Sequence, residues 1–476
     1  MRNYFQHRDT EFTENLSEKN NRLSFRLPYS VYTSCFNSTS RMLRYLPLCS
    51  LCLCVSIFIS SQAHAAETRT LTLDQALSIA MEKNRDIEKA REYATYLQGK
   101  YIEERSAALP QFSLNAAAYL AKDDSQSAYG NSARQFSRST DVTLSQPLFT
   151  WGKIGAAIRA AEIGLKTADQ QLRFYRQAAY RDVSAAFYDI LLARELYHQA
   201  LENRAQKQRH LDEARRKFAA GVATDYDILA AEVALENSQP GLIRTENSIR
   251  TAREKLRFLL ALDDQQVDVS GSLETETKQP LPYAEALDRA LHKRPELDDA
   301  KLRLGIYNEL ITIAQADNKP RVDLKGSGGW HWLGLGSGAT TSEGNGAAWN
   351  VGVFLTFPFF DGLKTSGRVI QANSDLRSRQ IEEAKLIQSV ALEVREAGNA
   401  LSEAAEITQA LTGTVKQADR LLQMAEKGYE FGVKIKLEVD DAQVNLVQSR
   451  SNLARAQRDY RVAQVNYEWV MGVAGE

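Results

Sequence analysis

The sequence predicts a mainly α-helical protein with a membrane β-barrel portion, built from two copies of one structural unit. Long heptad patterns, internal matches at an offset of about 210 residues, and proline-bounded alternating segments lead to this fold class. The chain is rich in Ala, Glu, Gln, Arg and Leu and contains only 10 prolines, which favours long helices over several globular domains.

The internal duplication sets the domain boundaries. Segment 72–80 matches 282–290, and further matches in the same register pair 84–87 with 294–297, Pro110 with Pro320, 146–149 with 357–360, and 218–222 with 429–433. We expect a first repeat at 66–263, a linker at 264–282 and a second repeat at 283–476.

Each repeat contains one very long helix. In the second repeat, apolar and small residues step by three and four from Ile387 to Ala425, which is a heptad seam with recurring alanine. The predicted helix, 363–428, is about 100 Å long, and its counterpart is 152–217. Shorter helices at 85–108, 224–262, 296–318 and 434–471 have the right lengths to stack in pairs beside the long ones. Seams of this length also predict packing between subunits.

The interruptions between the helices have strand character. Apolar and polar residues alternate in the pairs 110–150 and 320–358, as in strands with one lipid face and one wet face. Polar loops are expected at 121–139 and 334–347, and Trp330, Trp332 and Trp349 suit an aromatic girdle. The alternative is two soluble hairpins with tryptophan cores. Four strands cannot close a membrane barrel, so subunits would have to share one.

The amino-terminal 65 residues read as an extension followed by a secretory signal peptide. An apolar run at 46–59 follows Arg41 and Arg44 and precedes Ala63-His64-Ala65, which predicts cleavage after Ala65. All four cysteines lie before that site, so the mature chain has no disulfide. Leu48, Leu51 and Leu53 directly precede three of these cysteines, which disfavours lipidation. Met42 is an alternative start to Met1.

The composition gives no sign of catalysis or of nucleic-acid binding. Lysine plus arginine balances aspartate plus glutamate at a net charge of −1. The mature histidines are scattered without companions at metal spacing, and the glycine-rich segment 334–338 lacks the lysine of a phosphate-binding loop. We expect no enzyme activity, cofactor or metal.

The chain resembles the TolC family of outer-membrane efflux and secretion channels. The resemblance lies in the order of the duplication, the proline-bounded strand pairs and the Gly-Val turns at Gly221 and Gly432. The resemblance covers about 66–471. It implies a homotrimer with a shared 12-stranded barrel in the outer membrane, a long periplasmic α-helical barrel, and 264–282 in an equatorial belt. It also implies passive export of small molecules or proteins through an efflux pump or type I secretion system. Its partners would be a periplasmic adaptor and an RND, ABC or MFS inner-membrane transporter.

Two groups of polar residues are candidate sites. By resemblance, Glu438 and Asp441 would form an acidic ring at the periplasmic entrance, and Asp227 would contact Tyr429 and Lys434 in a latch that closes the tunnel. The alternatives are local: first-turn carboxylates favour the helix dipole, and Thr224 with Asp227 forms a capping box.

Two rival classes remain open at this point. A periplasmic adaptor is also built around a long helical hairpin, but it should have one hairpin flanked by β domains rather than two equal copies. Another coiled-coil structural protein of the envelope is disfavoured by the strand pairs.

Overall fold

The structure is a computed structural model that describes residues 69–123, 133–262, 266–337 and 340–475. These residues belong to one compact unit that begins at Ala65. The predicted extension and signal peptide lie outside the described residues, as does the tip of the first predicted loop, 124–132.

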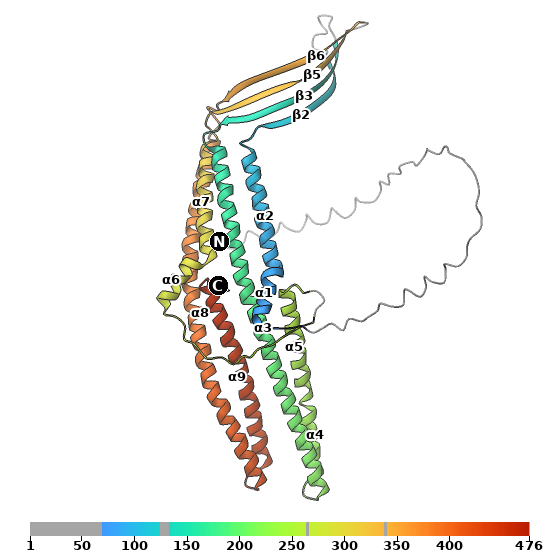
Figure 1. Ribbon diagram of the computed structural model, residues 1–476, viewed down its shortest axis with the longest axis vertical. Coiled ribbons are helices and arrows are strands. Elements are labelled where there is room, and N and C mark those ends of the chain that lie inside the picture. The colour runs from blue at the N-terminus through green and yellow to red at the C-terminus, as the bar shows by residue number, and fades with distance from the viewer. Residues whose placement is uncertain (1–68, 124–132, 263–265, 338–339, 476) are drawn as a thin grey trace, which may run out of the picture. The chain divides into compact units, whose positions relative to one another are not determined.

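Two helices of 67 residues each, α3 (Lys153–Ala219) and α8 (Lys364–Glu430), confirm the predicted long helices. Shorter helices flank them: α2 and α5 pack on α3, and α7 and α9 pack on α8 (Figure 1). The predicted stacking of short helices beside each long one is therefore confirmed. The shorter helices are α1 (Leu73–Lys83), α2 (Arg85–Ser106), α4 (Asp225–Glu236), α5 (Gln239–Leu259), α6 (Tyr283–Lys293), α7 (Pro295–Gln315) and α9 (Lys436–Val470).

One predicted helix is broken. The segment 224–262 was expected to be continuous, but α4 ends at Glu236 and α5 begins at Gln239. Pro240 lies in the first turn of α5, where its missing N–H and fixed φ are tolerated; within a continuous helix the same residue removes a backbone hydrogen bond. The proline therefore restarts the helix.

The predicted heptad seam of α8 is largely buried. Val390, Val394, Ala397 and Leu401 lie in an apolar cluster with Tyr460 of α9. Nearer the α8–α9 turn, Ala418, Leu422 and Ala425 pack against Val439, Ala442 and Leu446. Small residues along the seam allow the two helices to approach closely.

The strands form one antiparallel sheet in the order β2-β3-β5-β6. Their bounds are β2 Gln111–Asp123, β3 Ala133–Phe149, β5 Arg321–Ser337 and β6 Thr340–Thr356. The predicted loops 121–139 and 334–347 were too long, because β2 and β3 pair as far as Asp123 and Ala133, and β5 and β6 pair as far as Ser337 and Thr340. Backbone hydrogen bonds continue the ladder through glycine and polar residues alike. A prediction of the strand ends from side-chain polarity alone was therefore wrong.

The register separates the sheet into an apolar face and a polar face. Cross-strand partners share a face, so Leu114 lies beside Val142 and Trp349 beside Gly328. On the opposite face, Ser113 bonds Thr143 at 2.6 Å and Asn350 bonds Ser327 at 2.7 Å. The apolar face carries Phe112, Leu114, Leu120, Val142, Leu144, Leu324, Trp330, Trp332, Trp349, Val351, Val353 and Leu355.

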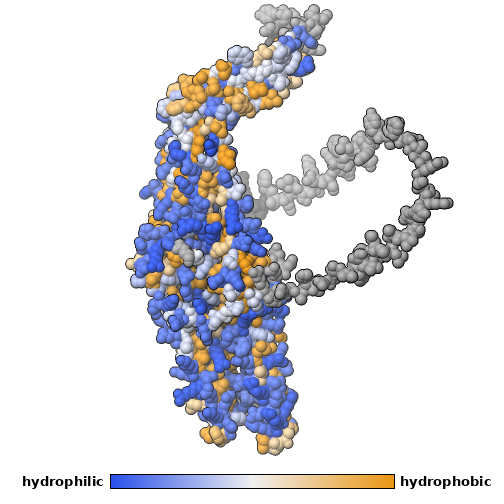
Figure 2. All heavy atoms as spheres, in the orientation of Figure 1, coloured by the Kyte–Doolittle hydropathy of each residue, from blue (hydrophilic) through white to orange (hydrophobic). Residues whose placement is uncertain are grey.

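The sheet ends in two edge strands. Within the described residues, β2 and β6 each pair on one side only. Figure 2 shows the apolar side chains of the sheet gathered toward the helices, with more polar ones toward its far end. In the described part of the chain, no helix is both long and apolar enough to cross a membrane.

The segment before α6 was predicted as a linker, and it includes a strand that sequence reasoning missed. β4 (Val267–Val269) pairs in parallel with β1 (Arg69–Leu71) and packs in the core beside α3. Beyond it, the Lys278 N–H donates to the Tyr460 hydroxyl at 2.6 Å, and Arg461 donates to the Glu274 carbonyl at 3.1 Å. The segment therefore ties α3 to α9 halfway along the helices.

Candidate functional site: the polar seam between α3 and α9

A row of polar contacts joins α3 of the first repeat to α9 of the second, and we call it the α3–α9 seam. Close to the β1–β4 pair, Arg458 donates to Asp189 at 2.8 Å. The seam then runs toward the start of α9 through the pairs Gln199–Ser451, Glu202–Arg450, Asn203–Gln443, Lys207–Asp440 and His210–Lys436. Its last pair is Lys217–Tyr429, in which Tyr429 belongs to the end of α8.

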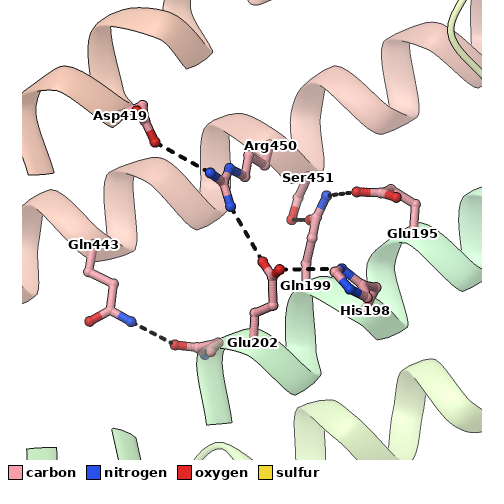
Figure 3. Close-up of polar contacts among 9 residues, drawn as sticks. Glu195, His198, Gln199, Glu202, Asp419, Gln443, Arg450 and Ser451 are labelled. Atoms are coloured by element: carbon pink, nitrogen blue, oxygen red, sulfur yellow. Dashed lines mark hydrogen bonds and ion pairs between the residues drawn. The ribbon is translucent and has the colours of Figure 1, made fainter. Parts of the chain in front are cut away.

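Figure 3 shows the middle of this seam. The buried Gln199 side chain accepts from Ser451 at 2.8 Å and donates to Glu195 at 3.0 Å. Arg450 reaches both Glu202 on α3 and Asp419 on α8, each at 3.4 Å, so one guanidinium links three helices (Figure 3). Such bonds fix the register of the helices but contribute little net free energy, because water can replace each partner.

Farther along, the seam depends on a neutral histidine. Lys436 Nζ donates to His210 Nδ1 at 2.8 Å, so Nδ1 must carry a lone pair. Burial of the imidazole lowers the pKa of His210, and the nearby Lys436 and Lys207 lower it further, whereas Asp440 and Glu213 act in the opposite direction. The surroundings therefore favour the uncharged ring.

The seam ends with a contact between the two long helices. Lys217 Nζ donates to the Tyr429 hydroxyl at 2.9 Å and lies 4.6 Å from the centre of its ring. Lys217 also pairs with Glu213 at 2.7 Å, and the hydrogen bonds to Glu213 and Tyr429 raise the pKa of its ammonium. This lysine therefore stays charged and holds the ends of α3 and α8 together.

The predicted ring residues lie at the start of α9, beside this contact. The Glu438 carboxylate pairs with Lys434 and accepts the Ile435 N–H at 3.1 Å, and these bonds lower its pKa. Asp441 is exposed one turn later. Both side chains thus lie near the turn between α8 and α9, but Glu438 is already paired with a cation.

The structure does not bring the predicted latch together within one chain. Asp227 accepts the Thr224 N–H and hydroxyl, both at 2.8 Å, and these two bonds lower the pKa of its carboxyl. The Asp227 N–H donates in return to the Thr224 hydroxyl at 3.4 Å, which completes the capping box. Tyr429 contacts Lys217, and Lys434 pairs with Glu438. Each of the three residues has a different partner.

Sequence reasoning missed the seam because its partners lie more than 200 residues apart. A signal was nevertheless present: Gln199, Asn203, Lys207 and His210 form a polar stripe at helical spacing on α3. Among the residues that the structure describes, no group of three His, Cys, Asp or Glu side chains is placed to hold a metal ion.

Comparison with known proteins agrees with this architecture. A family model described as outer membrane efflux protein matches residues 76–262 and 286–473, one match in each repeat. Outer membrane protein TolC of Escherichia coli is 24% identical over 432 residues, covering 89% of this chain and 86% of the relative. Alkaline protease secretion protein AprF of Pseudomonas aeruginosa is 25% identical over 341 residues, covering 70% of this chain and 69% of the relative. The crystal structure of the Campylobacter jejuni CmeC outer membrane channel has a TM-score of 0.72 at 18% identity and covers 84% of this chain and 86% of that one.

Proposed function

The chain belongs to the outer membrane efflux protein family and is an outer-membrane efflux or secretion channel; we propose that three copies form the conducting duct. Three four-stranded sheets would close one 12-stranded barrel, with β2 of one subunit beside β6 of the next. The observation that carries the proposal is the division of an open-edged sheet into an apolar and a polar face, because an open sheet edge is not tolerated in lipid.

The helices support the same assembly. Four apolar residues of α8 lie outside its buried heptad positions, and each is more than half exposed: Ile370, Ile381, Leu392 and Met424. Apolar side chains spaced along a helix of this length gain free energy when a neighbouring subunit covers them. A ring of three α3–α8 pairs would form the periplasmic tunnel.

We further propose that the α3–α9 seam holds the tunnel closed. Polar pairs near water contribute about 0–1 kcal/mol each, so a binding partner can break them at low cost. Lys217–Tyr429 is the last bond of the seam. The predicted latch of Asp227, Tyr429 and Lys434 would then act between subunits, since within one chain each has another partner.

We propose that Asp441 supplies most of the negative charge of the entrance ring, because the charge of Glu438 is partly neutralised by Lys434. Threefold repetition would place these carboxylates around one opening, where they attract cations. The proposed partners are a periplasmic adaptor and an inner-membrane transporter of RND, ABC or MFS type, which supply the energy that a passive duct lacks. We also propose that 66–263 and 283–476 are repeats of one ancestral unit.

Two measurements test the proposal. The mass of the detergent-solubilised protein should correspond to three chains, and a stable monomer would contradict the shared barrel. In planar bilayers the trimer should have low resting conductance, and the substitution Tyr429→Leu at the end of the seam should raise it. A trimer with high wild-type conductance would retain the duct but exclude the closing role of the seam.

A further inference from the structure

An arginine lies on the apolar face of the sheet, where charged side chains are costly. Arg138 of β3 is exposed, and its cross-strand partners are Ala118 of β2 and Trp332 of β5. Its guanidinium lies 4.8 Å from the centre of the Phe136 ring. No carboxylate pairs with Arg138 among the described residues, and the acid on this face, Glu343, belongs to β6, two strands away.

The height of Arg138 along the barrel explains how the charge is tolerated. At the end of the sheet nearest the helices, Val322 is paired with Phe149, and Arg138 is paired with Trp332, ten residues farther along β5. Ten residues extend about 33 Å along a strand, or about 25 Å along the membrane normal at a tilt of about 40°. That is the thickness of the apolar band of an outer-membrane barrel, so Arg138 stands at its outer boundary.

The surroundings of Arg138 are those of a membrane interface. Trp330 and Trp332 lie on the same face with ring centres 6.3 Å apart, and tryptophans favour the level of lipid headgroups. Beyond this level, Lys122 of β2 continues the same face toward the strand ends. An arginine at this depth turns its guanidinium toward the headgroups, where phosphate offers a bidentate partner.

We propose that Arg138, with the Trp330–Trp332 pair, binds a phosphate group of lipid A in the outer leaflet. The proposal rests on the proposed barrel, in which the apolar face meets lipid. The aromatic rings would contact the first methylenes of the acyl chains while the guanidinium pairs with the phosphate. Repetition in the trimer gives three such sites.

Native mass spectrometry of the purified trimer, with defined lipids added, tests this site. Doubly phosphorylated lipid A should remain bound to the wild type, and Arg138→Gln should weaken its binding about tenfold. Arg138→Lys keeps the positive charge but loses the bidentate geometry, so its lipid A binding should lie between that of the wild type and that of Arg138→Gln. Lys325→Gln is the matched control: it removes a cation from the polar face of the neighbouring strand, and lipid A binding should be unchanged.

Equal lipid A binding by Arg138→Gln and Lys325→Gln would overturn the assignment. Binding of phosphatidylglycerol as tightly as lipid A would overturn it as well, because any anionic lipid would then suffice. The same spectra report subunit number. Loss of the trimer in the wild type would refute the proposed duct, whereas an intact trimer without lipid A refutes only this site.

Discussion

The turn between α3 and α4 and the turn between α8 and α9 have the same backbone but different side-chain contacts. Gly221 and Gly432 both have positive φ, at 76° and 72°. The next residue bonds back in each turn, Val222 to Lys217 at 2.9 Å and Val433 to Gly428 at 2.8 Å. The two copies therefore keep one helix-ending geometry that requires glycine.

The difference lies in where each turn carries its lysine. The first turn has Lys217 before its glycine and Ala223 after it, whereas the second has Gly428 before and Lys434 after. A Cβ on Gly428 would lie 2.4 Å from Lys434 Cγ. Glycine at 428 thus makes room for Lys434 to pair with Glu438, while Lys217 projects across to Tyr429.

The two turns have different tasks. The first turn is closed by its own residues, since Thr224 and Asp227 bond each other. The second turn and the start of α9 reach across to α3 through Tyr429, Lys436 and Asp440. Side chains of the second copy therefore complete the seam, and substitutions there should affect gating more than their counterparts in the first copy.

The largest change in resting conductance is expected from Tyr429→Leu, because this substitution removes both the acceptor for Lys217 and the aromatic ring. Three copies of a contact worth about 0.5–1 kcal/mol sum to about 2 kcal/mol, or about 30-fold in the open fraction. Resting conductance in planar bilayers should rise accordingly. Phe218→Leu, at the equivalent position of the first turn, is the control and should leave conductance unchanged. Equal conductance of the two variants would remove the distinction between the turns.

Resting conductance should change several-fold with pH because of the titration of His210. Its pKa is lowered in the folded seam, mainly by burial and by Lys436. The neutral ring is therefore favoured when the seam is closed, and the stability of the seam is fully present above the unfolded pKa of about 6.5. It is lost as pH falls from there through the lowered folded pKa. Conductance should increase over that acidic range.

Two variants separate this histidine from other acid effects. His210→Asn keeps an acceptor for Lys436 but does not titrate, so conductance should become independent of pH in this range. His198→Asn removes an exposed histidine that pairs with Glu202 at 3.6 Å, and it should retain the wild-type profile. A pH dependence that survives in His210→Asn would locate the titrating group elsewhere.

Block of the channel by cations tests which of the two acids, Glu438 or Asp441, contributes more to the entrance ring. Glu438 is paired with Lys434, whereas Asp441 has no ion pair among the described residues. Asp441→Asn should therefore weaken block by a trivalent cation from the periplasmic side by about twofold or more. Glu438→Gln should change it less. The reverse order would mean that Lys434 leaves Glu438 when the trimer assembles.

The sequence predicted the long helices and the strand pairs because periodicity and proline placement are local signals. It misplaced the strand ends at 121–139 and 334–347, since a glycine-rich stretch resembles a loop until a partner strand supplies hydrogen bonds. It also joined α4 to α5, because Pro240 at the start of a helix does not interrupt the apolar pattern.

The site was less predictable than the fold. The seam depends on pairings such as His210 with Lys436 and Lys217 with Tyr429, which only the packing of α3 on α9 and of the two long helices at their tips brings together. Asp227 illustrates the converse. Its capping box was visible in the sequence, and the structure contains it, while the contacts with Tyr429 and Lys434 that the family resemblance implies stay predictions.

The smallest effects are expected from substitutions at the helix caps, which should change Tm slightly and leave conductance unchanged. The first cap is a reciprocal box, with Thr224 and Asp227 bonding each other's backbone N–H. In the second, Glu438 accepts from the Ile435 N–H, but isoleucine offers no acceptor in return. Ile435→Thr should complete the box and raise Tm by about 1–2 °C, and Thr224→Ala should lower it by a similar amount. Neither substitution touches the seam, so conductance should remain at the wild-type level in both. If Ile435→Thr instead raised conductance, the exposed isoleucine would itself be part of the closing contacts, and the division of tasks between the two turns would have to include it.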